Sequence, residues 1–172
     1  MTAYDDLPTG ADEVLEDIHS ARAEIEAIID QLSQEQMTEA TDEGGWSIKD
    51  HLAHIAEWQR RGLAIIEGRT SWEALGIDRE TWESKDIDEI NQLIYERHKD
   101  ESLPEVLTDF RKTQEKVILA LEQMNEEDLD RRIPDNFNEK YDRIIDLVEA
   151  NFAGHDRDHV EDIRELANQP VD

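Results

Sequence analysis

Apolar residues recur at spacings of three and four along four long segments of the chain, which is typical of amphipathic helices. These segments cover residues 11–34, 47–67, 103–124 and 140–167. None of them alternates apolar and polar residues as a half-buried strand does. The pattern therefore predicts an all-α protein, and four such helices favour a four-helix bundle.

Residues at the predicted helix ends agree with these boundaries. Ser47 is a suitable N-cap for the second helix, with Asp50 three positions later near the positive end of that helix. Ser102 and Glu105 form the Ser-x-x-Glu pattern of a capping box at the start of the third helix. Gly68 is a natural stop for the second helix.

The link between the second and third helices is unusually long. Residues 68–86 have no long periodic pattern but contain Trp72 and Trp82, and a short helix is predicted within residues 86–100. Such a connection often forms a lid or binding loop. Packing of the two tryptophans over the end of the bundle is the simpler alternative. We therefore predict an up-down four-helix bundle with a long crossover loop and a short extra helix between helices 2 and 3.

Length and charge narrow the class of protein. The 172 residues fit one domain, predicted as residues 1–172, with residues 1–9 disordered or loosely attached. The formal net charge is −27 and is spread along the chain, so no nucleic acid and no membrane is expected as a partner. No apolar run approaches the roughly 20 residues that span a bilayer. The acidic N-terminus is unlike a signal peptide, and a cytoplasmic location is the default expectation.

The candidate chemistry lies in the histidines, because the chain has no cysteine and any transition-metal site has to use His, Asp or Glu. The stretch "FAGHDRDHV" contains His155 and His159. At 100° per residue both are predicted in the middle of the apolar stripe of the fourth helix. This spacing places two imidazoles one turn apart, where both can bind one ion. The alternative is a pair of hydrogen-bonded core residues.

A third ligand is expected from another helix, and the helical wheel leaves its identity open. On the second helix His51 falls inside the apolar arc and His54 just beyond its edge, which favours His51 slightly. Asp162 lies at the edge of the stripe that contains the histidine pair and is a candidate either to accept a hydrogen bond from a ligand imidazole or to bind the ion directly. Glu57 falls on the opposite side of the second helix and is the poorer candidate.

The remaining histidines are weaker candidates. His19 lies off the apolar stripe of the first helix, and Glu16 lies on its solvent face, so a di-iron site of the Glu-x-x-His kind is rejected. His98 is predicted to be a surface residue.

Two stretches, "GGWSIKDHLAHIAEWQ" and "GHDRDHVEDI", together resemble the DinB-like superfamily of four-helix bundles. A third, "DIDEINQLIYERHKDESLPEVLTDF", is similar to the ClbS/DfsB-type members. The superfamily pattern has a metal-binding histidine eight residues after a tryptophan and a closing His-x-x-x-His on the last helix. Trp46 plus eight is His54. The resemblance therefore implies a metal triad of His54, His155 and His159, with His51 as a neighbour that faces the core.

The resemblance also implies a function. Superfamily members of this kind bind a divalent metal, often nickel or zinc, and several are metal-dependent hydrolases or transfer low-molecular-weight thiols. Three protein ligands leave coordination positions open, as in catalytic rather than structural sites. We expect a hydrolase or thiol transferase that acts on a small molecule in stress or detoxification. A non-enzymatic protein that binds a small molecule is the alternative, and a homodimer is compatible with the sequence.

Overall fold

The computed structural model describes residues 11–170, and within this range the regular elements are helices and no strand forms. The four long elements are α1 (Ala11–Ile29), α3 (Ile48–Ile66), α7 (Leu103–Glu122) and a composite last helix. The last helix joins α9 (Ile144–Val148), the π-helical segment η2 (Glu149–Gly154) and α10 (His155–Ala167). The all-α prediction is confirmed. The expectation for residues 1–9 falls outside the described range.

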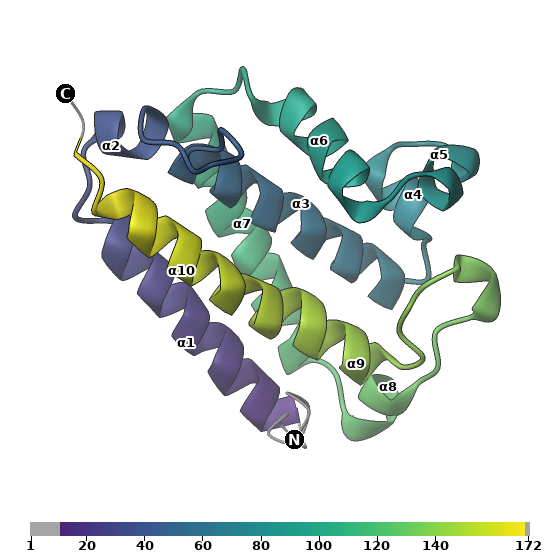
Figure 1. Ribbon diagram of the computed structural model, residues 1–172. Coiled ribbons are helices and arrows are strands. Elements are labelled where there is room, and N and C mark those ends of the chain that lie inside the picture. Colours follow the sequence, from purple (N-terminus) through teal and green to yellow (C-terminus); the bar gives the residue numbers. More distant parts are fainter. Residues whose placement is uncertain (1–10, 171–172) are drawn as a thin grey trace, which may run out of the picture.

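The first and last helices run side by side in the same direction (Figure 1). Asp17 pairs with Arg157 near the start of this contact, and Glu24 pairs with Arg164 about two turns further along both helices. Exposed ion pairs of this kind add little to stability, but they show which residues of the two helices lie opposite each other. The pairing shows that α10 returns along α1 instead of opposing it.

Helices α3 and α7 also run parallel to each other. Lys49 at the start of α3 donates hydrogen bonds to the carbonyl groups of Lys99 and Glu101, just before α7 begins. Further along, Arg60 of α3 pairs with Asp109 of α7. The direction order is therefore up, down, down, up, because the long crossover carries the chain back to its starting end (Figure 1).

The crossover contains more helix than the sequence pattern predicted. The expected short helix is α6 (Ile87–His98), but residues 68–86 also contain α4 (Ser71–Leu75) and α5 (Arg79–Ser84). Segments of five or six residues are too short to show a helical period, so only their capping residues signal them. Thr70 and Glu73 form a capping box for α4, and the side chain of Asp78 caps α5.

Three further short helices lie in the remaining links: α2 (Gln34–Thr38), α8 (Glu126–Asp130) and η1 (Asp135–Phe137). The first predicted helix, residues 11–34, ends earlier than expected at Ile29. A new start follows, because Ser33 and Gln36 form a capping box for α2. The predicted starts at Ser47 and Ser102 are confirmed by their capping boxes.

Helix α3 is buried on nearly all sides, because the crossover covers the face that would meet solvent in a bare four-helix bundle. Ile90 and Ile94 of α6 pack with Trp58 and Leu75 over that face. Glu57, which the helical wheel places opposite the apolar arc, is consequently only 5% exposed. The prediction of a surface His98 is wrong, since His98 is 8% exposed and lies 3.5 Å from Glu57.

The π-helical segment changes the face that the last helix buries. The backbone N–H of His155 bonds to the carbonyl of Ala150, five residues back, so the segment contains about one residue more per turn than an α-helix. Residues after it are rotated relative to a wheel drawn at 100° per residue. The buried face of α10 contains Asp156, Val160 and Ile163. His155 and His159 are partly buried at its edge, and the prediction that they lie mid-stripe is wrong.

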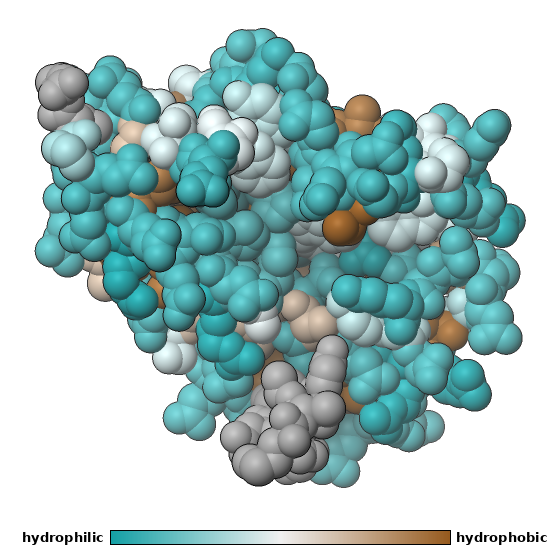
Figure 2. Space-filling view, viewed as in Figure 1, coloured by the Kyte–Doolittle hydropathy of each residue, from teal (hydrophilic) through white to brown (hydrophobic). Residues whose placement is uncertain are grey.

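The visible surface is largely hydrophilic, with isolated hydrophobic residues (Figure 2), as the charge of −27 implies. Among the described residues no helix is long and apolar enough to cross a membrane.

Candidate metal centre

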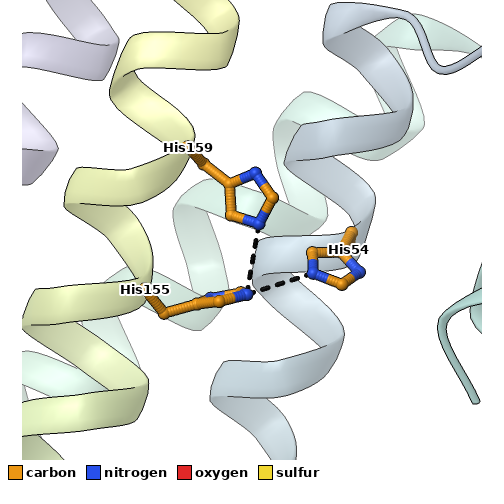
Figure 3. A group of neighbouring side chains, drawn as sticks. All are labelled: His54, His155 and His159. Atoms are coloured by element: carbon orange, nitrogen blue, oxygen red, sulfur yellow. Dashed lines mark hydrogen bonds between the residues drawn. The ribbon is translucent and has the colours of Figure 1, made fainter. Parts of the chain in front are cut away.

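Three histidine side chains converge between α3 and α10 (Figure 3). His54 comes from α3, and His155 and His159 lie one turn apart on α10. The Nε2 atom of His155 is 3.0 Å from Nε2 of His54 and 3.2 Å from Nε2 of His159. The structure therefore brings together all three residues of the triad that the family resemblance implies.

The donor set and its spacing fit a divalent transition metal. Three imidazole nitrogens that bind one ion at roughly 2.0–2.1 Å in a tetrahedral arrangement lie about 3.3 Å apart, close to the separations found here. Imidazole is a ligand that suits zinc and nickel alike. His54, His155 and His159 are close enough together to hold an ion.

Burial keeps His54 and His155 in the neutral form that binds metal. Burial in the bundle lowers the pKa of His155 to about 3, with a further contribution from the nearby His159. Burial also strongly lowers the pKa of His54. A neutral imidazole has a free lone pair, whereas a protonated one has to lose its proton before it can bind. His54 and His155 are therefore ready to bind near neutral pH.

His51 extends the cluster on the other side of His159. Its Nδ1 atom lies 3.0 Å from Nδ1 of His159, and its Nε2 atom lies 3.0 Å from Oδ2 of Asp42. Asp162 Oδ2 lies 3.3 Å from the same Nδ1 of His159, and its side chain is 50% exposed. His51, His159 and Asp162 form a second group that could hold an ion. Both candidates from the second helix, His51 and His54, thus point at the histidine pair.

Trp46, the residue that anchors the family pattern, packs directly against both histidines of α3. Its ring centroid is 5.6 Å from that of His51 and 5.1 Å from that of His54, both in edge contact. The indole also stacks on Tyr95 of α6, with the ring centroids 5.7 Å apart. The crossover therefore holds the tryptophan, and the tryptophan holds the two imidazoles in place.

The histidine cluster opens into a cleft of about 1240 Å³. Trp46, Trp58 and Trp82 line it together with all three triad histidines. Of the two crossover tryptophans, Trp82 thus contributes to the cleft. Trp72 is not among the lining residues, and the Arg79 guanidinium lies 5.4 Å from its ring. Aromatic walls with a few convergent polar groups are typical of small-molecule sites.

The sequence pattern did not indicate two further polar groups beside the cluster. Arg61 pairs with Glu139 at the wall of the cleft, and Glu139 lies in a link with no periodicity. Asp156, next to His155, is fully buried and accepts hydrogen bonds from the side chains of Gln59 and Gln114. The rotation caused by η2 turns Asp156 inward, so a regular wheel could not predict its burial.

Several solved structures have the same fold. An uncharacterised protein from Clostridium difficile 630 matches with a TM-score of 0.75 at 15% identity, covering 96% of this chain and 99% of that one. The colibactin self-resistance protein ClbS, crystallised in complex with a dsDNA, matches with a TM-score of 0.71 at 14% identity over 95% and 99% of the two chains. DfsB, a sibling lethal factor precursor, matches with a TM-score of 0.67 at 17% identity over 92% and 95%.

The ClbS complex corrects one expectation. The net charge of −27 predicts that nucleic acid is excluded as a partner, but a protein of this fold is crystallised with dsDNA, and this prediction is wrong. Net charge is a sum over the whole molecule and sets the average field. It does not decide whether one local surface can contact a phosphate backbone.

The similarity to ClbS and DfsB agrees with the resemblance drawn from the sequence, at the level of fold. No curated protein matches the chain. The family comparison matches the DinB superfamily over residues 17–163, a range that contains all three triad histidines. The chain belongs to the DinB superfamily.

Proposed function

We propose that His54, His155 and His159 bind a divalent metal ion, nickel or zinc, and that the protein is an enzyme acting on a small molecule held in the adjoining cleft. The observation that carries this proposal is the convergence of the three Nε2 atoms at the wall of an aromatic cleft. The reaction class is hydrolysis or the transfer of a low-molecular-weight thiol.

Each part of the site has a role in this proposal. A bound divalent ion supplies Lewis acidity, which favours deprotonation of a water or thiol near pH 7. The three histidines would hold the ion, and a site with only three protein ligands would leave coordination positions open for water or substrate. Trp46, Trp58 and Trp82 offer flat apolar walls that bind the non-reacting part of a substrate and exclude water.

Metal analysis of purified protein tests the site. Wild type is expected to bind about one equivalent of zinc or nickel under non-chelating conditions, and His155→Ala is expected to lose it. His19→Ala is the matched control, because His19 is an exposed histidine on α1. The site assignment fails if His155→Ala binds the ion as tightly as wild type and His19→Ala do.

Activity requires a separate assay. Metal-loaded and metal-stripped protein are compared on ester and amide substrates and on the addition of small thiols to an electrophile. Turnover that is lost in the metal-stripped protein and restored when metal is added back supports the proposal that the protein is an enzyme.

A non-enzymatic binding protein is the second candidate, favoured by the size and aromatic lining of the cleft. It would bind an aromatic probe equally well with and without metal and would turn nothing over. Since ClbS is crystallised with dsDNA, dsDNA belongs among the ligands tested.

A further inference from the structure

His51 links the triad to the carboxylate of Asp42, so that the three side chains of Asp42, His51 and His159 form a continuous line. Asp42 lies in the turn before α3, His51 in the first turn of α3 and His159 on α10. Asp42 Oδ2 is 3.0 Å from His51 Nε2, and His51 Nδ1 is 3.0 Å from His159 Nδ1. The remaining ring nitrogen of His159, Nε2, faces the triad.

Donor and acceptor rules determine where the hydrogens lie along this line. An ionised carboxylate can only accept, so Nε2 of His51 carries the hydrogen. In neutral His51 the Nδ1 atom is then an acceptor, and it pairs with a hydrogen on Nδ1 of His159. Neutral His159 is left with a bare lone pair on Nε2. One assignment therefore satisfies every contact in the line.

We propose that Asp42, acting through His51, fixes the tautomer of His159 that presents an unprotonated Nε2 to the triad. The inference rests on the metal-binding role proposed for His159. Asp42 and His51 are positioning residues in this account. Imidazole ligands commonly donate the hydrogen of their other ring nitrogen to a fixed acceptor, which orients the ring and raises its basicity. Here the acceptor is a second imidazole.

The surroundings hold this line in place. Oδ1 of Asp42 accepts the backbone N–H of Trp46 at 2.9 Å, and the backbone N–H of Asp42 donates to the Trp46 carbonyl at 3.0 Å. His51 is 3% exposed. By contrast, the buried Nδ1 atoms of His54 and His155 have no hydrogen-bond partner among the described residues. Of the triad, His159 is the member whose tautomer neighbouring side chains can set.

Two other arrangements use the same atoms. Asp162 could accept the Nδ1 hydrogen of His159, but it lies farther away at 3.3 Å and is half exposed. A second ion could be held by His51, His159 and Asp162. That ion would require His159 to bind through both nitrogens and lose both hydrogens. The line through His51 needs no such loss, which is why we favour it.

Replacing Asp42 with asparagine tests the proposal, because it should reverse the direction of the hydrogen bonds along the line. In Asp42→Asn the amide oxygen can still accept from Trp46, while the amide N–H₂ faces His51 Nε2 and makes it an acceptor. His51 Nδ1–H then donates to His159, whose own hydrogen moves to Nε2, where it blocks binding. Asp162→Asn tests the competing acceptor, since it removes the negative charge beside the same imidazole without reversing the hydrogen bonds between Asp42, His51 and His159.

Two readouts distinguish the outcomes. In metal-free protein, ¹⁵N-histidine NMR is expected to show the Nδ1–H tautomer of His159 in wild type and Asp162→Asn, and the Nε2–H tautomer in Asp42→Asn. Competition with a chelator is expected to show zinc affinity reduced about 10- to 100-fold in Asp42→Asn and within about threefold of wild type in Asp162→Asn. Circular dichroism confirms that each variant is folded.

Three results would overturn the proposal. The first is an Nε2–H tautomer of His159 in metal-free wild type. The second is a larger loss of zinc affinity in Asp162→Asn than in Asp42→Asn. The third is a second equivalent of zinc in wild type that disappears in His51→Ala, which would establish the two-ion arrangement. If wild type binds no metal, the proposed function fails, while the NMR comparison still decides the tautomer.

Discussion

Arg61 and Glu139 form a buried ion pair that ties α3 to the segment before the last helix. Their side chains are 4% and 2% exposed. Ser71 of α4 bonds to both, and the guanidinium lies 4.9 Å from the ring centroid of Trp58. Burial lowers the pKa of Arg61 and raises that of Glu139, while each charge offsets the shift of the other. Removing either partner alone should therefore lower the stability of the folded protein.

Glu139→Gln is expected to destabilise the protein by about 3–5 kcal/mol, because it leaves a buried guanidinium without its counter-charge. Urea denaturation at pH 7 measures this. Glu83→Gln removes the partner of Arg79 from an exposed pair and should cost less than about 1 kcal/mol. Similar losses in the two variants would show that the buried pair has no special role.

Gly62 of α3 is expected to resist replacement by alanine. A Cβ atom there would lie 2.6 Å from the Phe152 ring, which is fully buried in η2 and has little room to move. Overpacking costs about 1–3 kcal/mol, which offsets the gain of about 1 kcal/mol for alanine over glycine in a helix. We expect Gly62→Ala to destabilise the otherwise unaltered protein. In a Phe152→Leu background the same substitution should be neutral or stabilising. Equal effects in both backgrounds would contradict this contact.

Glu57 is expected to make stability depend on acid pH. Burial alone would raise its pKa, but the neighbouring His98, whose Nε2 lies 3.5 Å away, and the ion pair with Arg60 lower it to about 2. Because the folded pKa lies below the ordinary value of 4.5, the stabilisation is present above pH 4.5 and is lost as pH falls towards 2. Glu57→Gln should cost about 3 kcal/mol near pH 6, from 1.36 kcal/mol per pKa unit. Unfolding free energies between pH 3 and 6 should converge with wild type as the pH falls; a constant difference would refute this.

Asp156 is expected to make stability fall as the pH rises, which is opposite to the effect of Glu57. Burial raises its pKa to about 7, although hydrogen bonds from Gln114 and Gln59 oppose the shift. Between pH 3.8 and 7 the folded protein holds a proton that the unfolded chain releases, so stability falls as pH rises through this window. Asp156→Asn lacks this titration. Relative to wild type it should gain up to about 4 kcal/mol between pH 4 and 8 in metal-free protein, and parallel curves would exclude the shift.

The spacing of apolar residues predicted the long helices. It did not determine which histidine of α3 meets the histidine pair on α10. His54 and His51 flank the edge of one arc, where a helix meets its neighbour, so periodicity could not choose between them. The family pattern selected His54, and the structure directs both towards α10. The triad was therefore predictable from the resemblance, whereas its metal role stays a proposal.

Tertiary context explains most of what the wheel missed. Glu57 and His98 are buried because α6 folds back over α3, a contact between distant segments that no local period records. Asp156 is buried because η2 shifts the helical phase by about one residue, and a regular period of 3.6 cannot contain such a shift. The first miss concerns how distant elements meet, and the second concerns a local irregularity within one helix.

The separation of His54 and His155 by 101 residues in the chain also has a consequence for biosynthesis. A ribosome that has incorporated His54 works for roughly 5–20 s more before His155 is made, at about 5–20 residues per second. Until then His54 has no partner from α10. Any ion that requires all three imidazoles can enter only a chain whose last helix has emerged and docked, so loading would mark the end of folding rather than nucleate it.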